Sequence, residues 1–562
     1  MGVAEGRTGQ GVQVDPRMKW CGWGSEGTRY PLPTGAKAHL AEKFGVTGAD
    51  RISRPQGIDS VTIPPSRLSD AALGPLAREL GSEAVRTDHA MRIQHSVGRS
   101  YRDLVRLRAA HLPRAVDAVL YPGSGEELRR IMSTAAQENW ALVPFGGGTS
   151  VVGGVEPPPV ERPVVSVDMA RLSRCIEVDR RSRLATFEAG IFGPDLEAAL
   201  APHGMTLGHF PQSFEFSTLG GWVATRSAGQ ASTGRGRIDD LVHHLVVDAP
   251  SASLEAGGFP ASAAGPDLAR LLIGSEGRLG IIREVTVRLH EIPEETPVRA
   301  LLFRDFAHGW DALQELTGHP HSPTVLRLSD VEETELMATL SAPESASSKI
   351  LHGVGRRYLA GRGRPIPGSS LMLLTFEGSR PDASRGMKSA LRVLRRAGGL
   401  DVGAAPARRW RSERFRHPYL RDELMDLGLL VDTLETCTTW SRMGELYGSV
   451  KEALRTSIEA SGSPSAVMCH VSHLYGDGAS LYFTFFGRRD LEDPEGQWDR
   501  IKRAASDAIA SSGGTITHHH AIGYEHAPWL EAEVGSDTLG LLRSAARTVD
   551  PAGIMNPGKL LD

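Results

Sequence analysis

The sequence predicts an α+β protein built from at least two parts. At 562 residues the chain is longer than a single hydrophobic core ordinarily extends. Short runs of alternating apolar residues, such as Val164–Asp168 and Leu184–Glu188, indicate β-strands, and helical patterns such as Glu126–Asn139 lie between strands of this kind. Two prolines, Pro293 and Pro297, mark the point where a first α+β block ends and a second begins.

The chain divides into four segments. The first has a polar, glycine-rich start that we expect to be disordered, followed by helical patterns at Asp70–Gly81 and Tyr101–Ala110. The last is rich in turn residues from Asp550 to Leu561. The predicted boundaries are residues 1–112 for the N-terminal extension, 113–294 for the first block, 295–515 for the second block and 516–562 for the C-terminal segment.

Strand and helix patterns alternate through both blocks. In the first block, the predicted strands are Ala118–Pro122, Trp140–Pro144, Val164–Asp168, Leu184–Glu188, Leu245–Val247 and Ile281–Leu289. The second block has predicted strands at Val298–Phe303 and Leu371–Phe376 and a predicted helix at Trp310–Leu316. Between them, Ser341–Ser370 is rich in Gly, Ser, Arg and Pro, and we expect a long mobile loop there.

The overall composition argues against several classes of protein. A net charge of -4 provides no basic surface of the kind that nucleic-acid-binding proteins carry. The sequence has no apolar run of membrane-spanning length and no signal-peptide core, so we expect a cytoplasmic protein, with association at a membrane surface left open. The four cysteines are scattered, form no zinc or disulfide pattern and fit a reducing compartment; they are Cys21, Cys175, Cys437 and Cys469.

Three glycine-rich regions carry the first functional signal. They are Pro144–Ser150, the pair Gln212–Thr218 and Thr225–Ala228, and Gly274–Gly280. Backbone with such small side chains can press against a flat, phosphate-bearing ligand and donate N–H groups to it. One such loop alone is more often a tight turn, but three together indicate a large dinucleotide. Because the spacing is not G-x-G-x-x-G, a nicotinamide cofactor is not implied.

These loops, together with the closing Asn556–Leu560, resemble the vanillyl-alcohol-oxidase/p-cresol-methylhydroxylase (PCMH) family of FAD flavoproteins. The resemblance implies a two-part FAD-binding domain of the PCMH type, an α+β cap that holds the substrate, and a C-terminal segment that returns to the flavin. No His or Cys is evidently placed for covalent attachment, so non-covalent FAD is expected. The implied cofactor-binding residues are Pro144, Phe145, Gly146, Gly147, Gly148, Thr149, Ser150, Gln212, Ser213, Phe214, Glu215, Phe216, Ser217, Thr218, Gly220, Gly221, Thr225, Arg226, Ser227, Ala228, Gly274, Ser275, Glu276, Gly277, Arg278, Leu279, Gly280 and Ile281.

One branch of that family, the alkyldihydroxyacetonephosphate synthases, matches more closely still. Lys19–Gly24 and His209–Trp222 are similar to segments typical of the branch. Four further segments imply site residues by the same resemblance. They are Thr324–Leu328 with the active-site Arg327, Tyr419–Leu424 with the phosphate-binding Arg421, Ala479–Phe483 with the catalytic Tyr482, and Thr517–His520 with the catalytic triplet His518, His519 and His520.

The resemblance implies an enzyme of ether lipid synthesis. It would exchange the acyl group of acyl-dihydroxyacetone phosphate for a fatty alcohol, without net redox change, through an adduct at flavin N5. Tyr482 would be the general acid or base, His519 and His520 would move protons or bind phosphate, and Arg327 would position the flavin. Two long chains require an apolar tunnel, for which Leu424–Leu434 is a candidate lining, although a core helix explains that run equally well. The branch implies a homodimer, and the composition, rich in Arg, Gly and Ala, indicates a bacterial source.

A second candidate on the same fold is an FAD-dependent D-2-hydroxy-acid dehydrogenase, of the D-lactate, glycolate or 2-hydroxyglutarate type. The C-terminal end is typical of that group, and His470–Gly478 is similar to its metal motif. Leu474 and Leu481 stand at the two His positions of the motif. Because leucine cannot coordinate a divalent ion, we expect no metal site of that design. His470 and His473 remain as other candidate ligands.

Each candidate site residue also has a purely structural interpretation. Arg327 and Arg421 would be ordinary ion-paired arginines, unless the substrate has an acidic phosphate that both side chains bind. Tyr482 alternates with apolar neighbours and would be a core residue, whereas beside a flavin its phenol acts as acid or base where nearby cations lower its pKa. If the histidine triplet lies on a strand, His518 and His520 share one face, and no neighbouring carboxylate in the sequence orients them.

Overall fold

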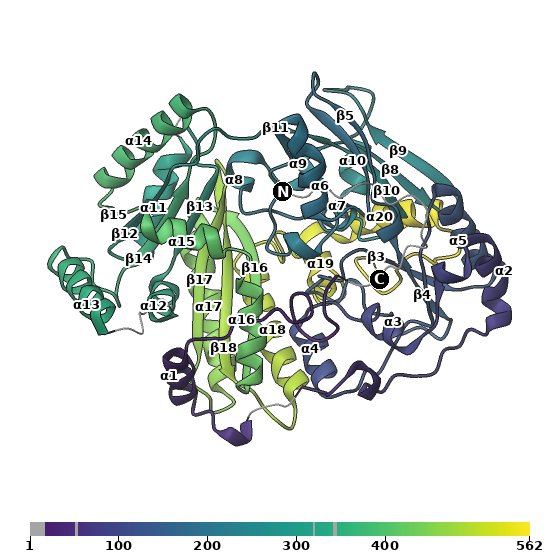
Figure 1. Ribbon diagram of the computed structural model, residues 1–562, viewed down its shortest axis with the longest axis horizontal. Coiled ribbons are helices and arrows are strands. Elements are labelled where there is room, and N and C mark those ends of the chain that lie inside the picture. Colours follow the sequence, from purple (N-terminus) through teal and green to yellow (C-terminus); the bar gives the residue numbers. More distant parts are fainter. Residues whose placement is uncertain (1–16, 51–53, 319–320, 341–345, 562) are drawn as a thin grey trace.

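The computed structural model describes residues 17–50, 54–318, 321–340 and 346–561. Two β-sheets lie in the first half of the chain, and a larger third sheet lies in the second half. Figure 1 shows the two halves side by side, with the C-terminal segment returning into the first. None of the helices in the described ranges is both long and apolar enough to span a membrane.

The first sheet consists of apolar strands that are mostly buried. Its strand order is β1 (Val85–Arg86), β2 (Ala118–Leu120), β4 (Val164–Asp168) and β3 (Ala141–Phe145). β2, β4 and β3 are parallel, so the chain must cross over between β2 and β3, and α5 (Gly125–Gln137) makes that connection. Ser124 caps α5 by accepting the N–H of Glu127. The helices that precede this sheet in the chain are α1 (Thr34–Phe44), α2 (Asp70–Leu80), α3 (His89–Gln94) and α4 (Tyr101–Arg108).

The second sheet is antiparallel, and its inner strands are more buried than the strands at its two edges. Its strand order is β5 (Cys175–Asp179), β6 (Leu184–Glu188), β10 (Ile281–Arg288), β8 (Val242–Ala249) and β9 (Ala252–Gly257). A two-stranded ribbon, β7 (Met205–Thr206) with β11 (His290–Glu291), adjoins it in the chain. The helices of this region are α6 (Gly193–Leu200), α7 (Leu219–Ala224), α8 (Ser232–Arg235), α9 (Ile238–Leu241) and α10 (Leu268–Leu272).

The third sheet has seven strands and two differently covered faces. Its order is β15 (Leu400–Gly403), β12 (Val298–Phe303), β14 (Ser370–Thr375), β13 (Val325–Ser329), β17 (Ala466–Leu474), β18 (Gly478–Arg488) and β16 (Leu429–Thr439). On one face Leu328 meets Gly309 of α11 (Phe306–Thr317), and Phe483 stacks near Tyr447 of α17 (Met443–Glu459). The other face carries polar side chains of β13, β17 and β18. Because neighbouring residues of a strand point to opposite faces, a core face and a functional face follow from the same strands.

Helices α12 (Val331–Leu340), α15 (Ala405–Glu413) and α16 (His417–Asp426) contribute to the polar side of this sheet. Two further helices of the second half are α14 (Arg380–Arg396) and α18 (Pro494–Ser511). α1 lies beside this half in Figure 1, and Asp50, which follows it in the chain, pairs with Arg488 of β18 at 2.7 Å. This part of the N-terminal segment therefore joins the second half of the molecule, whereas β1, further along the same segment, belongs to the first sheet.

The structure confirms the predicted strands and helices to within a few residues but corrects two segments. The expected mobile loop at Ser341–Ser370 contains a helix, α13 (Ala346–Gly361). This stretch has no proline, but its glycines interrupt the helical pattern in the sequence. The run Leu424–Leu434 is neither a helix throughout nor a single element. α16 ends before Gly428, whose φ of 95° only glycine adopts readily, and β16 then begins. The first 16 residues, where we expected disorder, lie outside the described residues.

The C-terminal segment closes the first half of the molecule. After α19 (Ala527–Val534) and α20 (Ser536–Val549), the chain returns to the parallel sheet. Leu142 of β3 donates its N–H to the carbonyl of Ile554, and its own carbonyl accepts the N–H of Asn556, both at 2.8 Å. This pairing places the turn-rich tail beside the glycine loop that follows β3.

Candidate active site

A large cavity lies between the two halves of the molecule. The glycine-rich loops form one wall, and β13, β17 and β18 with α12, α15 and α16 form the opposite wall. The centres of water molecules could occupy about 480 Å³ of it. Trp23 also lines the cavity, and it packs with Met18, Phe216 and Tyr419 in a small apolar cluster. The segment Lys19–Gly24 therefore contributes to the site itself.

The loop after β3 packs tightly against the loop that precedes α7. A Cβ atom on Gly147 would lie 1.7 Å from the carbonyl oxygen of Phe216, and one on Gly146 would lie 2.3 Å from Oγ1 of Thr218. Thr218 in turn caps α7 by accepting the N–H of Gly221. The glycines are therefore required for the two loops to pack against each other. From the sequence we expected them only to allow the close approach of a ligand.

The residues of this wall fit FAD. The loops present backbone amides and the hydroxyls of Thr149 and Ser150, a donor set that suits pyrophosphate oxygens. Asn556 donates its amide to the carbonyl of Glu276 at 2.7 Å, and its buried Oδ1 has no partner among the described residues, which leaves an acceptor for a ligand. Burial raises the pKa of Glu276 to about 7, although its carboxyl accepts two backbone N–H groups of the C-terminal segment.

Twenty of the residues expected to bind the cofactor line the cavity. They are Pro144, Phe145, Gly146, Gly147, Gly148, Thr149, Ser150, Gln212, Ser213, Ser217, Thr218, Gly220, Gly221, Thr225, Ser227, Ala228, Glu276, Gly277, Gly280 and Ile281. The others do not line the cavity; they are Phe214, Glu215, Phe216, Arg226, Gly274, Ser275, Arg278 and Leu279. Arg226, for example, pairs with Asp239 at 3.0 Å, and Arg278 donates to the carbonyl of Met555.

On the opposite wall, Arg327 is held in a buried ion pair. Its Nη2 lies 2.7 Å from Oε1 of Glu333 on α12, and its Nη1 lies 3.0 Å from Nε2 of His470 on β17. His470 Nδ1 contacts the same carboxylate oxygen at 3.0 Å. Burial alone would raise the pKa of Glu333, but Arg327 and His470 outweigh it and hold that pKa well below its usual range. The charge of Arg327 is thus neutralised within the protein.

Tyr482 lies beside this cluster on β18, facing the cavity. Its ring stacks on His470 at a centroid distance of 4.9 Å and lies 6.0 Å from His519 and 5.6 Å from His520. Burial raises the pKa of Tyr482 to about 12, and the charge of Arg421 offsets this only in part. The expected lowering of this pKa is therefore not found, and the phenol keeps its proton near pH 7.

The histidine triplet lies on a loop, so the strand considered from the sequence is wrong. Glu435 of β16 supplies the carboxylate that the sequence did not reveal. It accepts the backbone N–H groups of His518, His519 and His520 and the hydroxyl of Thr517. His519 and His520 line the cavity, whereas His518 turns away and its Nε2 lies 2.6 Å from the hydroxyl of Tyr475. Burial lowers the pKa of His519 and His520 to about 3, so both rings are neutral.

Arg421 of α16 differs from Arg327 because no carboxylate of the described residues lies within ion-pair distance of it, and Asp432 and Asp422 act on its charge only from further away. The side chain lines the cavity, and its buried Nε has no hydrogen-bond partner among the described residues. The neighbouring Asp422 is engaged by Arg108 at 3.3 Å and by the N–H of Trp23, and Asp432 accepts the indole N–H of a tryptophan. Burial lowers the pKa of Arg421 from its usual value. A guanidinium in this position favours an anionic ligand, since burying an uncompensated charge is costly.

Part of the cavity lining is apolar. Its apolar side chains come from α12, α15, α16 and the seven-stranded sheet, and they are Leu336, Met337, Leu340, Trp410, Leu420, Leu424, Val431, Met468 and Phe486. Two members of the predicted tunnel lining, Leu424 and Val431, belong to this set. Sequence reasoning did not find the other members, because they are distributed over five separate elements.

Comparison with known proteins places this chain among FAD proteins. A family model for an FAD binding domain matches residues 116–253, and one for the C-terminal domain of FAD linked oxidases matches residues 292–560. An alkyldihydroxyacetonephosphate synthase from Dictyostelium discoideum is 32% identical over 98% of this chain and 94% of its own length. A solved alkyldihydroxyacetonephosphate synthase structure is 30% identical, with a TM-score of 0.82 over 97% of this chain and 99% of that one.

p-Cresol methylhydroxylase shares the fold, with a TM-score of 0.64 at 15% identity over 88% of this chain and 98% of that one. These matches confirm the α+β, PCMH-type fold and FAD as the cofactor. Identity of about 30% over nearly the whole chain favours the synthases over the hydroxy-acid dehydrogenases. The chain belongs to the alkyldihydroxyacetonephosphate synthase family.

Proposed function

We propose that this protein exchanges the acyl group of an acyl-dihydroxyacetone phosphate for a fatty alcohol, and so forms the ether bond of ether lipids without net redox change. The observation that carries the proposal is the buried guanidinium of Arg421, which has no ion-pair partner among the described residues and lines a cavity that also has many apolar side chains in its lining. A guanidinium fork matches phosphate oxygens, and the apolar lining accommodates hydrocarbon chains. A small hydroxy acid would need no apolar space of this kind.

FAD, when bound by the glycine-rich wall, supplies an electrophilic ring that can hold the reacting carbon between loss of the acyl group and addition of the alcohol. Arg421 holds the phosphate and thereby fixes the position of the carbon to which the acyl oxygen is attached. Arg327 is a positioning residue, because its contacts with Glu333 and His470 orient the ring that stacks on Tyr482.

Proton transfer follows from the protonation states of the side chains. Tyr482 keeps its proton, while the imidazoles of His519 and His520 are neutral and can accept one. We assign removal of the substrate C1 proton to this imidazole pair and donation of a proton to the departing carboxylate to Tyr482. When the fatty alcohol adds, its hydroxyl proton restores Tyr482, and the imidazole pair returns a proton to C1 as the product leaves, so no proton is gained or lost overall. His518 supports the pair through its contact with His519 at 2.9 Å.

The proposal is tested by anaerobic incubation of the purified holoenzyme with acyl-dihydroxyacetone phosphate and a fatty alcohol. Mass spectrometry follows the free fatty acid and the ether product, with D-lactate and D-2-hydroxyglutarate supplied in parallel reactions. Ether formation without an electron acceptor is the expected result. Reduction of the bound flavin by a hydroxy acid, with no release of fatty acid, would instead assign the protein to the dehydrogenases.

We also propose how the cofactor is attached and how the chain is divided. FAD is bound without a covalent link, and in the described part of the chain no cysteine lines the cavity. Acid precipitation should therefore release all the flavin into the supernatant. Residues 113–294 with 516–562 form the flavin-binding unit, residues 295–515 the substrate cap and residues 1–112 an extension. Limited proteolysis that cut first near residue 294 and left two stable fragments would support this division.

The cellular setting is a further part of the proposal. We infer a bacterial, cytoplasmic homodimer that meets its lipid substrates at a membrane surface. Four free cysteines suit a reducing compartment, and two-chain lipids are poorly soluble in water. Light scattering coupled to gel filtration measures the mass of the assembly, and co-sedimentation with liposomes measures membrane association. A monomer, or protein that stays in the supernatant, would contradict the corresponding point.

A further inference from the structure

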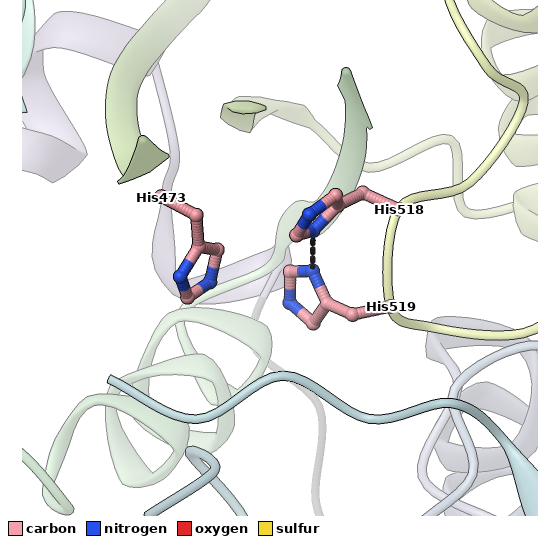
Figure 2. Close-up of side chains that lie close together, drawn as sticks. All are labelled: His473, His518 and His519. Carbon is pink, nitrogen blue, oxygen red and sulfur yellow. Dashed lines mark hydrogen bonds between the residues drawn. The ribbon is translucent and has the colours of Figure 1, made fainter. Parts of the chain in front are cut away.

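Three histidines from two distant segments converge beside the cavity. His473 lies at the end of β17, and His518 and His519 lie on the loop 44 residues or more further along. One ring nitrogen of each lies within 4.8 Å of a ring nitrogen of the others. Figure 2 shows the three rings gathered around a common space, with the hydrogen bond between His518 and His519 on one side of it.

The cluster has the features of a built site rather than of a chance contact. His473 is only 4% exposed, and its Nδ1 has no hydrogen-bond partner among the described residues. His518 and His519 share a hydrogen bond between their Nδ1 atoms at 2.9 Å, and Tyr475 holds the other nitrogen of His518. Glu435 fixes the loop through backbone N–H groups. Buried polar groups are nearly always partnered, so the free nitrogen of His473 indicates a ligand.

We propose that His473, His518 and His519 bind one divalent transition-metal ion of the zinc type. Neutral imidazole is a preferred ligand of such ions, and burial lowers the pKa of all three rings below the usual value. In a tetrahedral site with Zn–N bonds of about 2.1 Å, ligand nitrogens are roughly 3.4 Å apart, so small rotations of the rings suffice. The hydrogen bond between His518 and His519 is then replaced by two bonds to the metal.

The fourth ligand position would face the cavity, because His473 and His519 line it. Three protein ligands with one open position is the arrangement of zinc sites that bind water or a ligand oxygen. The charged neighbours are Glu435, whose Oε2 lies 3.6 Å from His519 Nδ1, and Arg237, which pairs with Asp239 at 3.4 Å. The second candidate set, Glu435 with His519 and His520, is less suited because four donors already occupy its carboxylate.

This site does not use the ligand positions of the hydroxy-acid dehydrogenase motif. Leu474 and Leu481 still exclude a metal at those two positions. The ion would instead be held by His473 and by two members of the triplet, His518 and His519. The sequence alone does not show that these residues are neighbours, because His473 and His518 are 45 positions apart. Metal binding can be measured without the proposed reaction, although the two share His519: when the ion is bound, removal of the substrate proton falls to His520.

The test is metal binding by the FAD-loaded protein after treatment with a chelator and gel filtration. Zn²⁺ is titrated and the bound metal is counted by mass spectrometry, and Co²⁺ is titrated in parallel while its visible absorption bands are recorded. Two variants, His473→Gln and His518→Gln, remove one ligand each. His308→Gln is the matched control, because His308 is a half-exposed histidine on α11 that pairs with Asp305.

One equivalent of metal is expected for the unsubstituted chain and for His308→Gln, with intense tetrahedral cobalt bands. Each ligand variant should bind the metal at least tenfold more weakly while keeping its flavin and its melting temperature. Less than one-tenth of an equivalent in the unsubstituted chain would overturn the proposal, as would unchanged binding in both variants. If the variants do not fold, the cobalt spectrum of the unsubstituted protein decides: octahedral or absent bands contradict the site. None of these measurements uses catalytic activity, so a negative result here leaves the proposed function to its own assay.

Discussion

The contrast between Arg421 and Arg327 leads to the sharpest prediction. Both arginines face the cavity, but Glu333 neutralises only Arg327, at 2.7 Å. Arg421→Met therefore removes a charge that has no direct ion-pair partner among the described residues, and we expect little loss of folding stability. Arg327→Met leaves Glu333 buried without its cation, which costs about 3–5 kcal/mol of unfolding free energy in comparable cases. The two substitutions thus separate a substrate contact from a structural one.

The effect on substrate follows from the hydrogen bonds that a guanidinium makes to phosphate. Each bond to a charged group contributes about 1.5–3 kcal/mol, and a bidentate pair makes two. The lower end of that range gives about 3 kcal/mol, which corresponds to a roughly 150-fold fall in affinity. We therefore expect the KM of Arg421→Met for acyl-dihydroxyacetone phosphate to rise by about two orders of magnitude, and the KM for the fatty alcohol to change little.

Steady-state kinetics with each substrate varied in turn measures these effects, and chemical denaturation of the same preparations measures stability. Flavin content serves as the control for the integrity of the site. The assignment of Arg421 to the phosphate is wrong if its substitution leaves the KM for the phosphorylated substrate within threefold of the original value. It is equally wrong if Arg421→Met destabilises the protein as much as Arg327→Met does.

Three further predictions concern the proton donor, the glycine wall and pH. Tyr482→Phe should lower kcat by about two to four orders of magnitude, the usual contribution of a general acid or base, while FAD stays bound. Gly147→Ala should lower the flavin content and the melting temperature, because its Cβ would lie 1.7 Å from the backbone oxygen of Phe216, which cannot yield as a flexible side chain would. Glu276→Gln should flatten the pH dependence of stability. The pKa of Glu276 is raised to about 7, so between about pH 4.5 and 7 the folded state binds a proton that the unfolded state does not. The free energy of unfolding of the unsubstituted chain therefore falls by roughly 3 kcal/mol as the pH rises through that window.

These outcomes are checked by kinetics, by flavin absorbance and by melting curves recorded from pH 5 to pH 8. Transfer activity retained in Tyr482→Phe would show that another residue is the proton donor. A Gly147→Ala protein with full flavin content would show that the two loops can separate without consequence. Parallel pH curves for the Glu276→Gln variant and the unsubstituted chain would mean that Glu276 titrates normally in the fold.

Much of the fold could be predicted because its signals are local. The strand Val164–Asp168 and the helix from Asp70 lie where period-two and helical patterns place them. α13 was missed because Gly353 and Gly355 interrupt its helical pattern, and because the segment around it has the composition of a loop. Gly428 shows the reverse case, since one glycine with a positive φ divides an apolar run into a helix and a strand.

The site could be predicted only where a resemblance or a glycine pattern marked it. Tyr482, Arg421 and the histidine triplet were found in this way. Glu435 could not be found, because it orients His518 from 83 residues away and no spacing rule connects the two. Glu333 was also missed: it stands six residues after Arg327, but the pairing depends on the turn between β13 and α12. Such partners become visible only when the sheet brings their strands together.

The most direct measurement is the stoichiometry of many turnovers under strictly anaerobic conditions, with the enzyme far below the concentration of both substrates and with no electron acceptor. Redox-neutral transfer predicts one ether product for each fatty acid released, with turnover continuing until a substrate is exhausted. Fatty acid release without ether product would show that water replaces the alcohol. Turnover that stops after one equivalent per flavin and resumes when an acceptor is added would show an oxidation and contradict the transfer mechanism.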